Sequence, residues 1–563
     1  MNTTFDALVI GSGISGGWAA KTLCEQGLKT CVIERGREVQ HNKDYPTAGL
    51  APWEIPHGGW MSRKFREENP LIIKAAGFGE DTAHFFIKDA DQPYVQEKPF
   101  DWIRGFQMGG KSLIWGRACQ RWSSSEFEAP AKYGYGIEWP VQYQEMAPWY
   151  SHVEDFIGVC GNKDGLEAMP DGEFLPPFEM NCVEKHMQQS LHQVFPDRHL
   201  VHGRWAHLTE PKPHHTALGR GKCQSRNLCM RGCPFGAYFS SNSSTLPAAE
   251  QTGLLTRLSD ALVVRILFNP DTQKAAGVEY INTSTGEHHT LTADIIFLNA
   301  SALNSVLLLL HSTSERFPNG LGNDHDLLGR YVCFHNYRGW AGGRFEGFKD
   351  TYIYGRNPSE LILANFRNVH QHNMPFYGGY TIFSGAYRPR NEAPPEDGPG
   401  IGAEYKEALR VPGDWHAYMY MQGETIPKAS NRVYLSKTKK DTWGIPQLVM
   451  EVGYDENDER MVQDFLTESK AMLQAMGCVD ITQHDSRQAP GLDIHEMGGC
   501  RMGKDPATSM LNEYNQLHAC PNVFVTDGAC MTSTGNQSPS LLYMALTARA
   551  ATYAAQQWKS KTL

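Results

Sequence analysis

The sequence predicts an α/β fold in which two parts, each with its own sheet, are interleaved along the chain. Two observations predict it. At the N-terminus an apolar run, a glycine-rich turn, a helical segment and a second apolar run follow one another directly. Far downstream, apolar and polar residues alternate over His416–Met421 and Arg432–Leu435, as in strands with one buried face. With 41% hydrophobic and 20% charged residues over 563 positions, the composition is that of a soluble globular protein.

The N-terminal segment has every part of a dinucleotide-binding turn. We expect Phe5–Ile10 to form a buried strand, residues 17–26 a helix, and residues 29–33 a second strand that ends at Glu34. The pattern G-x-G-x-x-G spans Gly11–Gly16, between the first strand and the helix. Because strand, helix and terminal acid accompany the glycines, the motif is far more specific than the glycines alone.

Each residue of this turn has a physical role. Gly11 permits the tight turn, Gly13 lets a pyrophosphate approach the backbone, and Gly16 lets the helix pack closely on the strand. The helix N-terminus offers N–H donors and a positive dipole to phosphates. Glu34 is placed to accept hydrogen bonds from both ribose hydroxyls, and its charge disfavours NADP. The motif does not decide between FAD and NAD.

Further motifs follow in a fixed order. They are Met108–Gly116 (MGGKSLIWG), Asp493–Gly503 (DIHEMGGCRMG), Asn522–Gly528 (NVFVTDG) and Ser538–Leu541 (SPSL). With the N-terminal turn, they resemble the glucose–methanol–choline (GMC) oxidoreductases over nearly the whole chain. The branch they resemble is that of bacterial sugar dehydrogenases and pyranose oxidases, including gluconate, fructose, glucose and glucoside 3-dehydrogenases.

The resemblance implies the GMC fold, with FAD between a Rossmann-type FAD-binding domain and a sheet-based substrate domain. The flavin should be non-covalent, because Ile114 stands where pyranose oxidases carry the His that bonds FAD. The Gly109–Gly110 loop would lie beside the flavin ring, and Asp527 near the ribityl chain. The segment Ser301–Val306 lacks the Pro of the family's second signature and matches it only in part. The cofactor contacts that we expect are Gly11, Gly13, Ile14, Ser15, Gly16, Glu34, Arg35, Gly109, Gly110, Ser112, Trp115, Gly116, Val264, Asp527, Gly528, Pro539 and Ser540.

The candidate catalytic residues lie near the C-terminus. Oxidising an alcohol requires a base with a pKa near the operating pH, and His495 aligns with the family's catalytic His. The family's second catalytic group aligns with Ser538, which would also cap a helix over residues 539–558; Asn536 and Gln537 are alternatives. The positive end of that helix would face the flavin and favour an anionic reduced ring. His495-Glu496 is not expected to bind zinc, because Gly499 stands where a second His would be needed.

Three cysteines lie close together in one loop. Cys223, Cys229 and Cys233 fall within the glycine-rich and polar stretch 221–236, among 13 cysteines in all. A disulfide would leave one thiol over, while zinc would need a fourth ligand such as His214 or His215. The resemblance implies a 3Fe–4S cluster, which three thiolates can hold and which would relay single electrons from the flavin.

Domain boundaries follow from these assignments. We expect the FAD-binding domain to collect residues 1–45, 100–127, 221–332 and 485–563, and the substrate-binding domain to collect 128–220 and 333–484. Residues 46–99 would form an excursion or lid, and Asn391–Gly402 a surface loop.

The expected partners are a sugar or glycoside substrate and, by resemblance, a small subunit, a cytochrome c acceptor, or both. The net charge of −10 without a basic stripe argues against nucleic acid, and no apolar run is long enough to span a membrane. No signal peptide is evident, so we expect either a cytoplasmic protein or periplasmic export together with a signal-bearing small subunit.

The sequence thus predicts an FAD-dependent glucoside 3-dehydrogenase-like enzyme, with hydride passing to the flavin and electrons passing through the cluster. The alternatives are a pyranose or glycoside oxidase that uses oxygen, and a gluconate or glucose dehydrogenase acting at another carbon. An alternative of a different class is an FAD-binding electron-transfer or regulatory subunit without a substrate of its own. His495 in an intact motif argues against the last.

Overall fold

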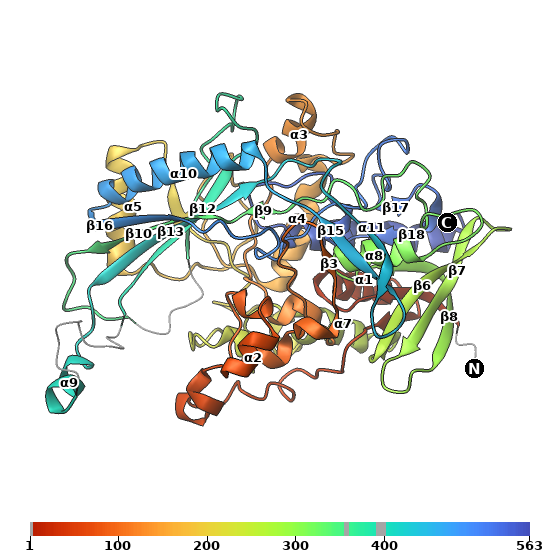
Figure 1. The fold of residues 1–563 in the computed structure, drawn as a ribbon, viewed down its shortest axis with the longest axis horizontal. Helices are drawn as coiled ribbons and strands as arrows, with labels where there is room; N and C mark the ends of the chain where they lie inside the picture. Colours follow the sequence, from red (N-terminus) through yellow and green to blue (C-terminus); the bar gives the residue numbers. More distant parts are fainter. Residues whose placement is uncertain (1–3, 354–359, 390–400) are drawn as a thin grey trace.

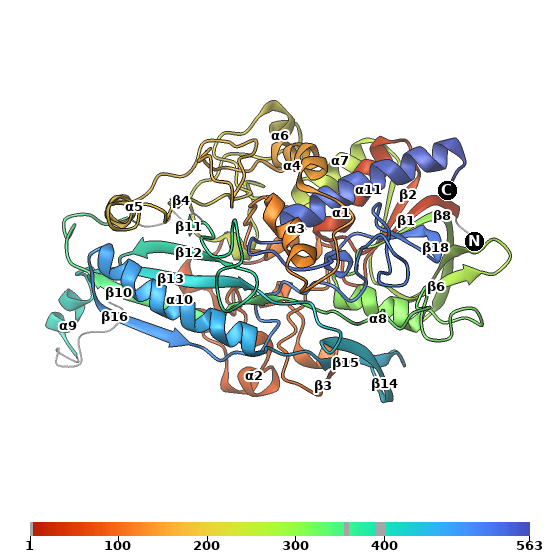
Figure 2. The ribbon, with the colours of Figure 1, turned by 90° about the horizontal axis from the view of Figure 1, so that it is seen from above.

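The computed structural model describes residues 4–353, 360–389 and 401–563. Two large sheets lie at opposite ends of its long axis, and helices cover each of them (Figures 1 and 2). Both termini lie at the end that holds the first sheet (Figure 1). This architecture confirms the predicted α/β class with two sheet-containing parts.

The first sheet has eight strands and a parallel centre. Strands β18, β8, β1, β2 and β5 pair in parallel in that order, and β17, β6 and β7 add antiparallel pairs. The bounds are β1 (Thr4–Ile10), β2 (Thr30–Ile33), β5 (Leu255–Leu258), β6 (Ala261–Asn269), β7 (Lys274–Asn282), β8 (His288–Leu298), β17 (Gln516–Leu517) and β18 (Cys520–Val525). β1 and β2 are nearly continuous apolar runs because both faces of a parallel sheet are covered.

Alanine-rich helices cover one face of this sheet. Helix α1 (Ile14–Glu25) packs against α7 (Thr245–Gln251) and α11 (Ser540–Ser560), with Ala7 and Val9 of β1 beneath them. α1 begins three residues earlier than the expected residue 17, because Gly13 already serves as its N-cap and the glycines that follow fit inside the helix. α8 (Leu303–His311) is a buried core helix that contacts β6.

The second sheet has seven strands, all antiparallel, in the order β16-β10-β13-β12-β11-β4, with β9 paired to β13. The bounds are β4 (Leu200–His202), β9 (His335–Asn336), β10 (Gly339–Phe345), β11 (Leu361–Leu363), β12 (Tyr380–Tyr387), β13 (Trp415–Glu424) and β16 (Cys478–Asp485). Helix α10 (Glu456–Ala475) packs on β10, β13 and β16, and α5 (Cys182–Val194) contacts α10. The alternation at 416–421 corresponds to β13, whose side chains alternate between buried and half-buried positions.

A small third sheet joins β14 (Arg432–Lys440), β15 (Pro446–Glu451) and β3 (Val95–Gln96). The remaining α-helices are α2 (Arg63–Glu68), α3 (Ser124–Lys132), α4 (Tyr143–Ile157), α6 (Pro213–Ala217) and α9 (Ala403–Ala408). None of the helices in the described ranges is long and apolar enough to cross a membrane. The expected loop Asn391–Gly402 lies outside the described residues except for its last two positions, which precede α9.

The strands of the first sheet come from segments that we assigned to the FAD-binding domain, and those of the second come from segments that we assigned to the substrate-binding domain. The eight strands of the first sheet fall within residues 1–45, 221–332 and 485–563. Those of the second fall within 128–220 and 333–484, except that β16 extends one residue further, to Asp485. Helix α4, although it belongs to segment 128–220, packs on α11 beside the first sheet. The domain boundaries remain a proposal.

Candidate active site

A cavity of about 630 Å³ lies between the parts of the molecule that carry the two large sheets. The glycine turn and the carboxyl ends of β1, β2 and β8 line one side, and side chains next to or within β4, β9, β11, β12 and β13 line the other. Ligands of open α/β sheets bind beyond the carboxyl ends of the parallel strands, and this cavity has that position. Of the expected cofactor contacts, Gly16, Gly109, Val264 and Pro539 do not line it; Val263 does so in place of Val264.

The glycine turn is so tight that side chains would not fit at two of its glycines. Gly11 has a φ of +95°, and a Cβ there would lie 2.3 Å from the carbonyl oxygen of Asn299. A Cβ on Gly16 would lie 1.8 Å from the carbonyl oxygen of Gly11. A Cβ on Gly13 would instead meet no other atom within 4 Å, so the backbone there is open to a ligand in the cavity.

Glu34 lies buried at the end of β2 and faces the cavity. One carboxylate oxygen accepts from the Ser12 hydroxyl at 2.5 Å and from its backbone N–H at 3.2 Å, and the other accepts from the Gly36 N–H at 3.1 Å. Burial raises the pKa of this carboxyl, and these hydrogen bonds oppose the rise. Arg35, the next residue, also lines the cavity and lies over the Phe106 ring.

Asp527 fixes the turn that follows β8. Its carboxylate accepts from the Ser301 N–H at 2.8 Å, the Ser305 hydroxyl at 2.6 Å and the Ala529 N–H at 3.0 Å. Burial raises its pKa to about 6. Ser301 and Ala302 both have positive φ, at 77° and 25°, so the segment that lacks the family's Pro has a strained backbone held by this carboxylate.

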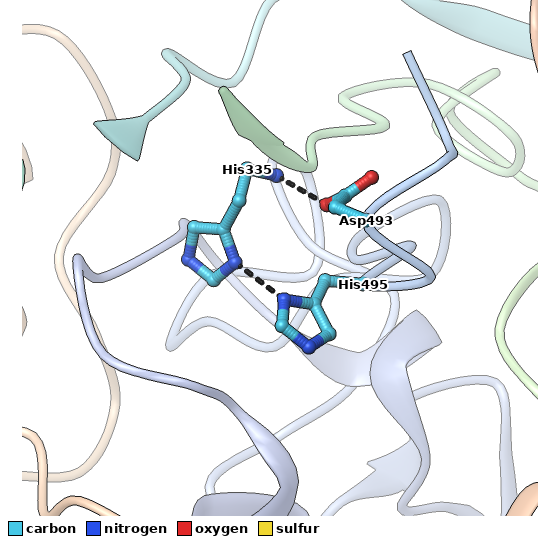
Figure 3. Close-up of side chains that lie close together, drawn as sticks. All are labelled: His335, Asp493 and His495. Carbon is cyan, nitrogen blue, oxygen red and sulfur yellow. Dashed lines mark hydrogen bonds between the residues drawn. The ribbon is translucent and has the colours of Figure 1, made fainter. Parts of the chain in front are cut away.

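His495 and His335 form a hydrogen-bonded pair. Their Nδ1 atoms lie 2.8 Å apart (Figure 3). His335 Nε2 lies 2.6 Å from the carbonyl oxygen of Gly535. A carbonyl only accepts, so His335 carries its proton on Nε2. Burial lowers the pKa of His335 to about 4, so its Nδ1 is an unprotonated acceptor near neutral pH.

The proton positions of His495 follow from this pair. Its Nδ1 must donate to His335, which leaves the lone pair on Nε2. Figure 3 shows this nitrogen pointing away from His335, and His495 lines the cavity. Burial lowers the pKa of His495 well below its usual value, and the nearby His335 and Lys111 lower it further. The arrangement is that of a neutral imidazole ready to accept a proton.

Asp493 completes this group. Its Oδ2 accepts from the His335 backbone N–H at 2.8 Å, and the ligand atoms of Asp493, His335 and His495 all lie within 4.8 Å of one another. A metal could fit such a set, but the 2.8 Å between two ring nitrogens is a hydrogen-bond distance. Proton sharing therefore accounts for the short distance between the two rings.

The residues proposed for the second catalytic position differ in their placement. Ser538 lines the cavity just before α11, and its hydroxyl donates to the Gln422 side chain at 3.3 Å. Asn536 and Gln537 do not reach the cavity: both donate to the buried Glu126 carboxylate, at 2.8 and 3.1 Å. Asn536, one of the expected catalytic residues, is therefore part of the wall behind the site.

Several cavity residues could not be identified from the sequence. The cavity residues Tyr337, Glu360, Phe383, Tyr420 and Trp205 come from the second sheet or from beside it. His335 also comes from this sheet; it does not line the cavity itself but bonds to His495. No local motif marks them, because the antiparallel pairing brings together strands that lie far apart in the sequence. A two-residue alternation could indicate the face of each strand but not the partner strand.

The cysteine loop lies against the cavity wall. Met230, next to Cys229, lines the cavity, and Arg117 donates to the Cys229 carbonyl at 3.1 Å. All three thiols are half-buried and free. Burial raises the pKa of Cys223 and Cys229, and the negative charge of the neighbouring cysteine thiolates raises it further. The three thiols are therefore close enough to interact electrostatically.

The geometry of the loop is not that of a single-ion site. Among the described residues, the group whose ligand atoms all lie within 4.8 Å is the histidine–aspartate group, and the three thiols do not form such a set. His214 and His215, proposed as a fourth zinc ligand, both lie with Nε2 at 3.0 Å from the Asp155 carbonyl. These distances disfavour the zinc alternative.

The cavity fits a large polar cofactor. Buried polar atoms without a partner in the described part of the chain line it, and an unpaired buried group costs about 1–3 kcal/mol. They include Gln92 Oε1, Arg104 Nε, Arg117 Nε, Asn299 Oδ1, Glu496 Oε1 and Tyr543 Oη. Together with the open backbone at Gly13 and the acid at the end of β2, these residues fit FAD.

The fold and the cavity define a dinucleotide-binding oxidoreductase. Two family models of the GMC oxidoreductases match the chain. The model of the family's N-terminal domain matches residues 211–336, and the model of its C-terminal domain matches residues 427–547. The chain belongs to the GMC oxidoreductase family. It is therefore an FAD-dependent enzyme that acts on CH–OH groups.

Individual relatives cover the whole length. The chain is 27% identical to a 2-methyl-1,2-propanediol dehydrogenase of Mycolicibacterium austroafricanum, over 98% of this chain and 95% of that protein. It is 24% identical to the fructose dehydrogenase large subunit of Gluconobacter japonicus, over 97% of each chain. A solved formate oxidase of Aspergillus oryzae has the same fold, with a TM-score of 0.61 at 12% identity over 100% of both chains.

Proposed function

We propose that the chain removes hydrogen from a ring hydroxyl of a hexopyranoside, in the manner of a glucoside 3-dehydrogenase. The observation that carries this proposal is the His335–His495 pair, which leaves an imidazole lone pair on the cavity side. The rings of Trp205, Phe383 and Tyr420 also line the cavity, and aromatic faces suit the C–H faces of a sugar.

The residues divide the chemistry as follows. Turning an alcohol into a carbonyl removes a proton from oxygen and a hydride from carbon. His495 Nε2 takes the proton, and His335 holds the ring in the required tautomer by accepting at Nδ1. Ser538 would orient the substrate by hydrogen bonding, since a hydroxyl is a poor base. When bound, FAD accepts the hydride, and the glycine turn, Glu34 and Asp527 would hold it.

Electrons then leave through the cysteine loop in this proposal. Cys223, Cys229 and Cys233 would hold a 3Fe–4S cluster. The position of Met230 at the cavity wall supports this role, because a cluster in the loop would lie near a cofactor in the cavity. The acceptor would be a one-electron partner such as a cytochrome c, with a small subunit that carries the export signal to the periplasm. The alternative is an oxidase that delivers electrons to oxygen.

Product analysis tests the proposed sugar oxidation, and metal analysis separately tests the proposed cluster. Oxidation of a methyl glucopyranoside should give a 3-keto product, whereas a gluconolactone from glucose would mean oxidation at carbon 1.

Anaerobically prepared protein should contain about three irons and acid-labile sulfide per chain. Cys229→Ser should lose the cluster and electron delivery to a cytochrome while flavin reduction by substrate survives. Cys182→Ser, a half-buried cysteine on α5, is the matched control. Zinc, or no metal, would favour the oxidase.

A further inference from the structure

Among the residues that the structure describes, the second sheet contributes a single carboxylate and no cation to the cavity. Its lining side chains are Tyr337, Glu360, Phe383, Tyr420 and Gln422, with Trp205 beside β4. The cationic residues that line the cavity come from other segments: Arg35, Lys74, Arg104, Lys111 and Arg117. A dinucleotide's phosphates account for positive charge on that side, but nothing in the FAD chemistry accounts for Glu360.

Glu360 is held by neutral donors. Its Oε1 accepts from the Tyr418 hydroxyl at 2.9 Å and its Oε2 from the Tyr420 hydroxyl at 2.8 Å. The Glu360 carbonyl accepts from the Trp205 indole N–H at 3.2 Å, which fixes the backbone. Each carboxylate oxygen accepts one hydrogen bond, so each keeps a free lone pair for a ligand.

No described Lys, Arg or His forms an ion pair with Glu360. Burial raises the pKa of its carboxyl, the two tyrosine hydroxyls oppose the rise, and the neighbouring Glu184 adds to it. A buried carboxylate is costly unless a cation pairs with it. Since the described residues supply none here, a positive charge on a ligand would complete the site.

Several aromatic rings line the same cavity as this carboxylate. Phe383 and Tyr420 stack with centroids 5.2 Å apart, Tyr337 lies 5.3 Å from Tyr420, and Trp205 lies 6.2 Å from Phe383. Aromatic faces attract cations by about 0.5–2 kcal/mol each. A carboxylate among aromatic rings therefore fits an ammonium group better than a neutral hydroxyl.

We propose that Glu360 binds a protonated amino group of the substrate, so that the alcohol oxidised is an amino sugar or a related amino alcohol. The site would hold the ammonium end, while the reacting carbon must face His495, which lines the same cavity. The identity of the substrate rests on the proposed alcohol oxidation, whereas the binding of an ammonium group at Glu360 does not. Binding and oxidation are therefore tested in separate experiments.

Binding tests the subsite without any oxidation. Cyclohexylammonium and cyclohexanol have the size of a sugar ring and differ in charge. In calorimetric titrations of the enzyme with its FAD already reduced, which cannot take a hydride, cyclohexylammonium should bind at least tenfold more tightly than cyclohexanol. Glu360→Gln should abolish that difference, and Tyr420→Phe, which keeps the carboxylate, should retain it. Equal binding of the two probes by the wild-type enzyme would overturn the proposal, whatever the folding of the variants.

Oxidation then tests the substrate class. Methyl glucopyranoside should be compared with its 2-amino, 4-amino and 6-amino deoxy analogues. At least one amino analogue should have a kcat/KM tenfold or more above that of the neutral glucoside, and Glu360→Gln should remove this advantage. Preference for the neutral glucoside, with an equal loss for all substrates in Glu360→Gln, would mean that the carboxylate binds hydroxyls. If no glycoside is oxidised but cyclohexylammonium binds as expected, the proposed sugar oxidation fails while the ammonium site stands.

Discussion

The tautomer of His495 depends on residues that lie far apart in the sequence. The Gly535 carbonyl fixes the proton of His335, and His335 then fixes the proton of His495. The motif around His495 indicates a base, but it says nothing about which ring nitrogen faces the substrate. His335 supplies that information from β9 of the second sheet.

The pH dependence of catalysis follows from this environment. His495 must be neutral to accept a proton, and burial, His335 and Lys111 all lower its pKa below 6.5. We therefore expect kcat/KM to stay constant from alkaline pH to below pH 6.5 and to fall only as pH drops through the lowered pKa of His495. An acid limb at or above 6.5 in the wild-type profile would have to come from a group other than His495.

A matched pair of lysine variants identifies the group. Lys111→Met removes a positive charge that lowers the pKa of His495, so the acid limb should move to higher pH. Lys74→Met, which lines the same cavity but pairs with Asp101, should leave the limb in place. Both variants keep Asp493, whose pKa burial raises to about 7, so any limb from that group appears in both. Equal profiles for the two variants would assign the limb to a group other than His495.

At the scale of elements, the glycine turn is the part that the sequence predicts best. The β1–turn–α1–β2 unit is local, so apolar runs, glycine spacing and the terminal Glu34 suffice to predict it. The predicted start of α1 is too late, because Gly16 and Gly17 have the composition of a turn although close packing retains them in the helix. The substrate side could not be predicted, because Glu360 and Tyr420 meet only through strand pairing across the second sheet.

Two glycines with nearly the same backbone conformation test the role of this turn. Gly11 and Gly27 have φ values of +95° and +91°, but a Cβ at Gly11 would meet Asn299 while one at Gly27 would have open space. Gly27→Ala should cost about 1–2 kcal/mol of unfolding free energy, from the left-handed backbone alone. Gly11→Ala should cost more and should also lose FAD. Thermal melts and flavin content measure both, and retention of full FAD occupancy in Gly11→Ala would count against the turn as the cofactor site.

At the scale of the whole molecule, FAD would contact segments from both ends of the chain. The cavity is lined from Ile10 to Tyr543, so a bound cofactor links parts that are distant in the sequence. Because Ile114 replaces the covalent His of pyranose oxidases, acid precipitation should release free FAD into the supernatant. Flavin that remains in the pellet would mean that another side chain forms the covalent bond.

Removal of the cofactor should also lower stability. A ligand present at one hundred times its Kd stabilises the folded state by about 2.7 kcal/mol. The protein without FAD should therefore unfold at a lower temperature, and added FAD should restore the original transition in a concentration-dependent way. An unfolding temperature that does not change with FAD would mean that the cofactor does not stabilise the folded state.

The central claim is that His495 takes the proton while FAD takes the hydride from an alcohol in this cavity. Rapid anaerobic mixing of the FAD-loaded enzyme with an oxidisable glycoside tests it most directly, with the loss of flavin absorbance as the signal. The wild-type enzyme should be reduced rapidly, and His495→Ala should be reduced about 10²–10⁴-fold more slowly while it retains full FAD content. Reduction of His495→Ala at the wild-type rate would contradict the account.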